Sequence, residues 1–288
     1  MLYYKLLRKR VVFTAHNINA GKRDENDTLL NRLTLMVQYR LADHIFVHTQ
    51  KMKSELQRDF GVPAELITVV PFGINNSIPA TALTTAEAKW RLGISNDEKT
   101  LLFFGGISPY KGLEYLVEAF LALAATSPEY RLIIAGLPKK GSEQYVNEIQ
   151  RGISASAFRP RIIQRLQYIP DEDAEMYFKA ADVLVLPYRH VFQSGVLFLG
   201  YSFGLPVVAA DVGAIREDIV EGKTGFLCEP CRPRELMAAI VKYFNSDLFR
   251  NLEGRRQEIC QHAKLRHSWE VVAMMTRKVY AELSTRPL

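Results

Sequence analysis

The stretch Val183–Ala210, VLVLPYRHVFQSGVLFLGYSFGLPVVAA, decides the fold. Its first four residues form an apolar run short enough for a buried strand, and Pro187 ends that run. Ser194 is a good N-cap for the helix that follows, and Gly204 closes that helix as a left-handed C-cap. The apolar residues 207–210 predict a second buried strand. This order predicts one βαβ unit of a parallel sheet, with a ligand crevice at the carboxyl ends of its strands.

The predicted helix start at Ser194 and Gly195 has the chemistry of an anion site. Gly195 leaves the first backbone N–H groups uncovered, and the positive end of the helix dipole lies behind them. Such a helix start suits a phosphate group. The alternative is an ordinary turn of a parallel-sheet protein, and this stretch alone does not decide between the two.

A second strand, glycine turn and helix occurs earlier in the chain. The apolar residues 101–104 lead into GGISPYKG at 105–112 and then into a predicted helix. Gly105 and Gly106 permit a close approach of the backbone, and Lys111 supplies a positive charge at the helix start, which again suits phosphate. The loop is neither a Walker A motif nor GxGxxG, which argues against a P-loop NTPase or a dinucleotide-dependent dehydrogenase.

The composition is that of an ordinary globular protein of one or two domains, with 288 residues, 48% hydrophobic and 24% charged. Three cysteines and the lack of an apolar leader predict a reducing compartment, with the cytoplasm as the expected location. No apolar run approaches the roughly 18 residues that a membrane span needs. Helix-turn-helix, RNP and zinc-finger spacings are missing from the sequence, so we expect no nucleic-acid partner.

The positive charge gathers in the amino-terminal part of the chain. The net charge is +6, and the first sixty residues carry eleven basic and six acidic side chains, which is nearly the whole excess. Five apolar residues lie in the same segment: Leu2, Tyr3, Tyr4, Leu6 and Leu7. This combination suits peripheral contact with anionic lipid or attraction of an anionic substrate, and a plain solvated surface is the alternative.

The rest of the chain alternates between predicted strands and helices. Further strands are expected at 10–15, 44–48, 67–70, 131–135, 161–166 and 226–228, and further helices at 28–41, 50–60, 84–92, 142–151 and 171–181, with two helices at the end. The stretch 71–80, PFGINNSIPA, loses periodicity and is typical of an interdomain connection. His16 stands just past the first strand, where α/β proteins place functional groups, although a lone histidine is more often structural.

Two short motifs resemble metal ligands, and we expect neither to bind metal. Asp171 and Asp173 form an Asp-x-Asp pattern in the first turn of a predicted helix, where the helix dipole favours acids in any case. Cys228 and Cys231 form a single C-x-x-C, which is at most half of a zinc site.

Two phosphate-friendly helix starts in one crevice suit a diphosphate. With them, residues 10–283 resemble the retaining glycosyltransferases of the GT-B fold in family 4, the glycosyl transferases group 1. The resemblance rests on these stretches in order: TAHNI, VVPFGI, FFGGISPYKGLEYLVEAF, LIIAG, YIPDEDAEMYFKAADVLVLPYR, QSGVLFLGYSFGLPVVAADVG, EGKTGFL and SWEVVAMMTRKVYAEL. It implies an α/β fold with a doubly wound, parallel-sheet donor domain and an incomplete Rossmann-like acceptor domain.

The resemblance also implies a division of labour along the chain. Residues 1–78 would be a partial acceptor domain, residues 79–267 the nucleotide-sugar domain, and residues 268–288 a helix that crosses back to the first domain. Such enzymes move a sugar from a nucleotide diphosphate sugar to a saccharide or lipid-linked acceptor with retention, as in polysaccharide biosynthesis. They usually need no metal or other cofactor, because basic side chains and helix-start amides stabilise the departing diphosphate.

Particular residues take roles from the resemblance. Lys111 would pair with the diphosphate in the Gly105–Gly106 loop, and the distal phosphate would be held by the amides of Ser194, Gly195 and Val196. The backbone around Tyr168 and Ile169 would border the base. His16 matches the histidine that faces the sugar or the acceptor, so His16 and Lys111 are the candidate catalytic residues.

The sequence departs from the family in its donor contacts. Many members carry two glutamates near this loop, where this chain has Val191 and Leu199. The arginine that usually precedes the phosphate lysine falls on Gly106. We expect the missing charge to come from one of three other side chains: Arg165, Arg189 and His190.

A third departure is length. A complete member usually has three or more strands before the one expected at 10–15, so the chain is expected to be a fragment, a truncated product or a chain completed by a partner. A parallel sheet without its central strands exposes apolar edges, which predicts marginal stability or self-association of the amino-terminal part.

Two other functions remain open at this point. The chain can be a non-catalytic, degenerate module that binds nucleotide sugar or a partner chain. It can also be another enzyme of the same fold, such as a nucleotide-sugar epimerase or a phosphorylase, although no pyridoxal lysine is identifiable. The sugar, the base, the acceptor and the linkage do not follow from the sequence.

Overall fold

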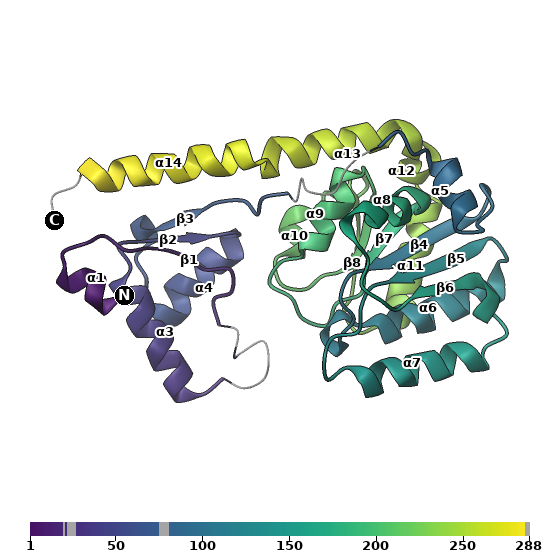
Figure 1. Cartoon of the computed structure of the whole chain (residues 1–288), viewed down its shortest axis with the longest axis horizontal. Helices are drawn as coiled ribbons and strands as arrows, with labels where there is room; N and C mark the ends of the chain where they lie inside the picture. The colour runs from purple at the N-terminus through teal and green to yellow at the C-terminus, as the bar shows by residue number, and fades with distance from the viewer. Residues whose placement is uncertain (20, 22–26, 75–80, 286–288) are drawn as a thin grey trace. The chain divides into compact units, whose positions relative to one another are not determined.

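The computed structural model describes residues 1–19, 21, 27–74 and 81–285. The chain divides into two compact units, one of Met1–Gly73 with Leu265–Leu288 and the other of Ile74–Lys264. Each unit is built on its own parallel sheet (Figure 1).

The second unit has a six-stranded sheet in the order β6-β5-β4-β7-β8-β9, and all its pairings are parallel. The strands are β4 (Lys99–Phe104), β5 (Tyr130–Ala135), β6 (Ile162–Arg165), β7 (Val183–Leu186), β8 (Val207–Ala210) and β9 (Gly225–Cys228). Strand order runs outward from β4 to β6 and then, on the other side, from β7 to β9. The sheet is therefore doubly wound, and its topological switch point lies between β4 and β7.

Helices cover both faces of this sheet, with α6 and α7 on one side and α8 and α9 on the other (Figure 1). The helices of this unit are α5 (Thr85–Arg91), α6 (Leu113–Thr126), α7 (Glu143–Ala155), α8 (Asp171–Ala180), α9 (Gly195–Ser202), α10 (Ile215–Asp218), α11 (Pro233–Phe244) and α12 (Asp247–Arg250). Helix α13 (Leu252–His267) follows and leads toward the end of the chain.

The two ends of α9 confirm the capping residues predicted from the sequence. The Ser194 hydroxyl accepts a hydrogen bond from the N–H of Leu197 at 3.4 Å. Gly204 takes the left-handed conformation, with φ of 64°. A Cβ on Gly204 would lie 2.4 Å from the carbonyl oxygen of Arg256, so only glycine lets α13 approach this closely.

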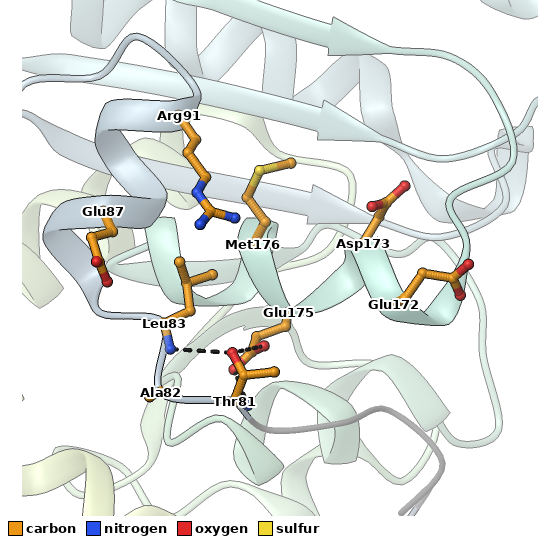
Figure 2. A pocket seen from close by; sticks show the side chains of 9 residues that line it. All are labelled: Thr81, Ala82, Leu83, Glu87, Arg91, Glu172, Asp173, Glu175 and Met176. Carbon is orange, nitrogen blue, oxygen red and sulfur yellow. Dashed lines mark hydrogen bonds between the residues drawn. The ribbon is translucent and has the colours of Figure 1, made fainter.

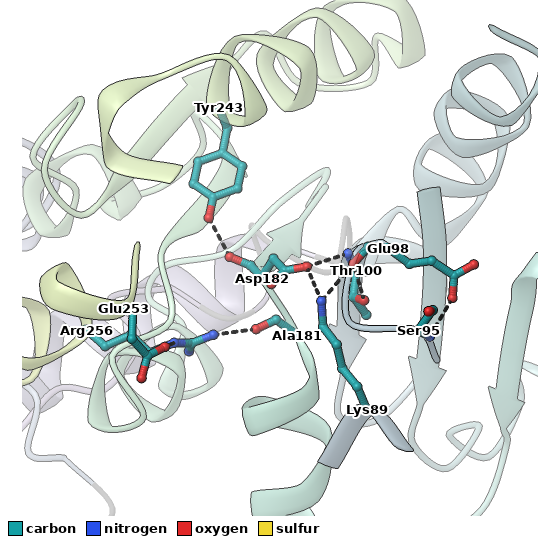
Figure 3. Close-up of polar contacts among 9 residues, drawn as sticks. All are labelled: Lys89, Ser95, Glu98, Thr100, Ala181, Asp182, Tyr243, Glu253 and Arg256. Carbon is teal, nitrogen blue, oxygen red and sulfur yellow. Dashed lines mark hydrogen bonds and ion pairs between the residues drawn. The ribbon is translucent and has the colours of Figure 1, made fainter. Parts of the chain in front are cut away.

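Asp182 ties three elements together in the interior of the second unit (Figure 3). Its carboxylate accepts hydrogen bonds from Lys89 Nζ at 3.0 Å and from the N–H of Thr100 at 2.7 Å. The Tyr243 hydroxyl donates to the Asp182 carbonyl oxygen at 2.5 Å. Lys89 also donates to the carbonyl oxygen of Glu98 at 2.7 Å, so this buried ammonium has both a counter-ion and a second acceptor.

The first unit has a three-stranded parallel sheet in the order β1-β2-β3. Its elements are α1 (Leu2–Leu6), β1 (Val12–Thr14), α3 (Leu29–Leu41), β2 (His44–Val47), α4 (Gln50–Phe60), β3 (Ile67–Val69) and α14 (Trp269–Thr285). Helix α14 contributes Val279 and Leu283 to a buried cluster with Phe46 and Val70. Apolar contact with the sheet therefore holds the carboxyl-terminal helix in this unit.

Two sequence predictions were wrong. In the described part of the chain four helices follow β9 instead of two, because Ser246 caps a new helix by accepting a hydrogen bond from the N–H of Phe249. Lys111 does not begin α6. It ends a 3₁₀ turn, Pro109–Lys111, and Gly112 with φ of 65° separates this turn from the helix.

Candidate functional site

The two glycine motifs form one site at the switch point between β4 and β7. The N–H of Arg189 donates to the carbonyl oxygen of Tyr110 at 2.8 Å, which joins the loop after β7 to the loop after β4. A Cβ on Gly112 would lie 2.1 Å from the carbonyl oxygen of Pro187, so a side chain there would push the loops apart. The carboxyl edge of a doubly wound sheet is where such folds bind ligands.

Lys111 lies at the centre of this site. A Cβ on Gly105 would lie 3.2 Å from Lys111 Nζ and 3.4 Å from Cγ2 of Val196, so the glycine makes room for the ammonium beside the first turn of α9. Nζ also lies 5.6 Å from the centre of the Tyr188 ring. The Tyr188 hydroxyl is 3.1 Å from Oγ of Ser194. The structure thus brings together the predicted residues of both motifs.

The charge of Lys111 has no counter-ion within the described part of the chain. Its side chain is buried, with 7% exposed, and no described carboxylate lies within 4.0 Å of Nζ. Burial, and then the nearby charge of Lys139, lower the pKa of Lys111 to about 8. Lys89 is also buried, with 3% exposed, but is paired with Asp182. An unpaired buried cation is costly, and a bound anion would remove that cost.

Unused hydrogen-bonding groups lie in the two loops that form the site. No described residue accepts a hydrogen bond from the N–H of Gly195 or Val196, at the start of α9. In the same loops, Oγ of Ser108 and Oε1 of Gln193 are buried without a partner among the described residues. Such groups are rare in proteins and are typical of a ligand site. Ser108 lies inside the GGISPYKG loop and Gln193 directly precedes Ser194, but nothing in the sequence alone marks either side chain as a ligand-binding group.

Of the three side chains expected to replace the missing charge at Gly106, two lie in other contacts and the third is exposed. Arg189 forms an ion pair with Glu114, which also accepts a hydrogen bond from Tyr145. Arg165 is exposed and donates to the carbonyl oxygen of Gln164 at 3.2 Å. His190 is exposed.

Two residues predicted to border the base, and the two positions where the family's glutamates are missing, lie elsewhere in the second unit. Tyr168, with 68% of its side chain exposed, and Ile169 lie in the loop between β6 and α8. Leu199 is buried within α9. Val191 lies in the loop after β7, where its carbonyl oxygen packs against Gly213.

In the first unit, His16 is held by a second histidine that the sequence analysis did not single out. His16 is exposed just past β1, and its Nδ1 lies 2.9 Å from Nε2 of His48, just past β2. His48 Nδ1 lies 3.1 Å from the carbonyl oxygen of Val70. Parallel strands bring their carboxyl ends to one edge, which explains why residues far apart in sequence meet here.

This arrangement fixes the proton positions of the pair. A carbonyl oxygen only accepts, so His48 carries its proton on Nδ1. Burial lowers the pKa of His48, which favours the neutral ring, and the neutral ring presents Nε2 as an acceptor. His16 must then donate from Nδ1. In neutral His16 the remaining nitrogen, Nε2, presents a lone pair that can accept a proton.

A hollow of about 450 Å³ lies between α5 and α8, lined by acidic, basic and apolar side chains (Figure 2). The buried Glu175, one of the lining residues, accepts hydrogen bonds from the N–H of Thr81 at 2.7 Å and from the Thr81 hydroxyl at 2.8 Å. Glu175 therefore fastens the start of the unit to α8. Asp171 and Asp173 lie in the first turn of α8.

Among the described residues, no group of three or more histidine, cysteine or acidic side chains is placed to hold a metal ion. The three cysteines are free. No described helix is both long and apolar enough to cross a membrane.

The fold and the site define a two-unit α/β protein. Its larger unit is doubly wound, and the topological switch point of that unit is suited to binding an anion. Residues 98–246 match the family described as Glycosyl transferases group 1, and residues 1–77 match Glycosyltransferase Family 4. The first match covers more than half of the 288 residues, so the chain belongs to the glycosyl transferases group 1, a family of sugar-transferring enzymes.

Relatives and solved structures agree with this family. The D-inositol 3-phosphate glycosyltransferase of Corynebacterium efficiens is 27% identical over 97% of this chain and 67% of that protein. A crystal structure of Anabaena Alr3699/HepE has a TM-score of 0.83 at 22% identity, covering 99% of this chain and 75% of that one. Sucrose-phosphate synthase from Thermosynechococcus elongatus has a TM-score of 0.75 at 21% identity, covering 98% and 70%. The fold is of the GT-B type, and the chain spans about two thirds of the length of the curated relatives.

Proposed function

We propose that the chain transfers a sugar from a nucleoside diphosphate sugar to an acceptor, with retention of the anomeric configuration. The observation that carries the proposal is Lys111, buried without a carboxylate beside the first turn of α9 at the switch point of the sheet. A departing diphosphate is the group that this cation and the unused amides would stabilise. Membership of the glycosyl transferases group 1 supports the same reaction class.

In this proposal the donor lies across both motifs of the second unit. Lys111 binds the diphosphate, which the Gly105–Gly106 backbone approaches closely, and the distal phosphate is bound by the start of α9 at Ser194, Gly195 and Val196. The backbone at Tyr168 and Ile169 borders the base. Anabaena Alr3699/HepE was crystallised with UDP and with UDP-glucose, which makes uridine the first base to test. The donor requires neither a metal ion nor another cofactor.

The acceptor side of the proposal rests on His16. Its Nε2 presents a lone pair in the neutral ring, held in place through His48, and such an atom can accept a proton from a sugar hydroxyl. The acceptor class is a saccharide or a lipid-linked saccharide. The name of the Corynebacterium efficiens relative adds an inositol phosphate to the acceptors worth testing.

A cytoplasmic location with peripheral membrane contact is part of the proposal. Helix α1 exposes apolar side chains, Leu6 at 80%, beside Arg8 and Lys9. Such a segment binds anionic lipid through both apolar area and charge. We expect the chain to sediment with vesicles that contain phosphatidylglycerol. The variant Leu6→Asp should lower the fraction of the protein that sediments with them. Equal sedimentation of the two proteins would exclude α1 as the contact.

Calorimetric titration of UDP, GDP and ADP, with EDTA and with Mg²⁺, tests the donor site. We expect one nucleotide to bind without metal, and Lys111→Met to weaken it at least tenfold, the loss typical of a charge-assisted hydrogen bond. Incubation with the matching sugar nucleotide and candidate acceptors, read by proton NMR, then gives the configuration of the product. Binding unchanged in Lys111→Met would refute the donor site, and an inverted product would refute retention.

A further inference from the structure

Gly106 has no side chain, but another residue fills the space beside it. A Cβ on Gly106 would lie 3.3 Å from Cε and 3.5 Å from Cγ of Lys139. The aliphatic stem of Lys139 therefore passes over Gly106, through the volume that a side chain at position 106 would enter.

Backbone contacts fix Lys139 in this place. The N–H of Ile107 donates to the carbonyl oxygen of Leu137 at 2.9 Å, and the N–H of Lys139 donates to that of Ile107 at 2.8 Å. Ile107 and Pro138 form a parallel bridge between the two loops. These bonds join the loop after β5 to the loop after β4. The pairing of the two strands therefore places Lys139 at the site.

Lys139 and Lys111 form a pair of like charges. Lys139 Nζ lies 5.5 Å from the centre of the Tyr110 ring, Lys111 Nζ lies 5.6 Å from that of Tyr188, and the two rings meet edge to face at 6.5 Å. No described carboxylate lies within 4.0 Å of either ammonium. Two neighbouring cations with no acid beside them repel each other. An anion bound between them would attract both and offset this repulsion.

We propose that Lys139 is the second cation of the donor site, where it binds the diphosphate together with Lys111. Its positive charge takes the place of the arginine charge that is missing at position 106. The inference rests on the proposed function and adds a binding residue to it. Because the contact lies on the leaving group, Lys139 contributes to the affinity for both the donor and the nucleotide product.

Three variants of the full chain test the proposal by calorimetry with UDP, GDP and ADP. Lys139→Ala is expected to lower the affinity for the nucleotide that the wild type binds by about tenfold. It should also reduce the dependence of this affinity on salt concentration. Lys140→Ala is the matched control, because this neighbouring lysine is also exposed and its loss changes the net charge by the same amount. We expect the control to stay within about twofold of the wild type.

The double variant Gly106→Arg with Lys139→Ala tests whether the loss in Lys139→Ala comes from the missing positive charge or from a change in the loop structure. Gly106 is not in the left-handed region, and its nearest side-chain neighbour is the one that Lys139→Ala removes, so arginine fits there. Recovery of most of the lost affinity supports the proposal. Equal affinities of Lys139→Ala and Lys140→Ala, or a loss that Gly106→Arg does not recover, overturn it. A wild type that binds none of the three nucleotides overturns the proposed function itself, and the inference with it.

Discussion

Replacing Lys111 by methionine should stabilise the ligand-free chain while it removes nucleotide binding. Methionine has a similar length and no charge, so Lys111→Met leaves little cavity and removes the buried ammonium. In the native chain this ammonium is buried without a counter-ion among the described residues. Its removal should therefore raise the free energy of unfolding.

The pKa of Lys111 gives the size and the pH dependence of this effect. Burial, and then Lys139, lower the pKa from 10.5 to about 8, and one pKa unit corresponds to about 1.4 kcal/mol, so the gain at pH 7 is about 3 kcal/mol. Below pH 8 both native and unfolded chains hold the proton, and the full cost is present. Between pH 8 and 10.5 only the unfolded chain holds it, so the wild type gains stability as the pH rises. The advantage of the variant should shrink across this interval.

Urea unfolding of the full chain at pH 7 and pH 10 tests this, with Lys89→Met as the matched control. Lys89 is also buried but paired with Asp182, so Lys89→Met leaves an unpaired buried carboxylate and should cost about 3–5 kcal/mol. The two lysine variants are thus expected to change stability in opposite directions. A Lys111→Met chain that is less stable than the wild type at pH 7, or whose advantage is undiminished at pH 10, would refute the reasoning.

Three further changes have expected outcomes. Gly195→Pro removes one unused N–H at a helix position that accepts proline, so it should weaken nucleotide binding in calorimetry. Gly195→Ala keeps the N–H and should bind the nucleotide as the wild type does. Equal binding by the two variants would exclude a role for that amide. His48→Phe leaves His16 without its acceptor and should lower the transfer rate about tenfold, with nucleotide affinity unchanged; an unaltered rate would remove His48 from the acceptor site. Glu175→Ala leaves two donors of Thr81 without their acceptor and should cost about 1–3 kcal/mol in urea unfolding, more than Glu175→Gln; equal losses would contradict this account.

The strands and helix caps were predictable because their signals are local. The strands at 183–186 and 207–210 fall where expected, since each is a short apolar run bounded by glycine, proline or a polar turn. Ser194 and Gly204 cap α9 as expected, because capping depends on a few neighbouring residues. The end of the chain was harder, since nothing in its apolar periodicity separates α11 from α12 before Ser246 is recognised as a cap.

The contacts of Lys139 and His48 were not predictable, because each depends on which strands become neighbours. Lys139 reaches Gly106 only because β5 pairs with β4 in a register that brings their carboxyl ends level. His48 reaches His16 through the same kind of pairing between β2 and β1. A sequence read one element at a time can place a histidine or lysine at the end of a strand, but it cannot say what lies across the sheet edge.

The contrast between the two buried lysines of the second unit indicates what the switch point is shaped to bind. Lys89 donates to Asp182 and to a carbonyl oxygen, which is how an interior stabilises a structural charge. Lys111 has the charge of Lys139 and unused N–H groups near it instead, and both favour a negatively charged ligand. A single carboxylate would satisfy one of these groups and leave the others unpaired. A ligand with two linked phosphates offers acceptors for both ammonium groups and for the start of α9, which is why we favour a diphosphate.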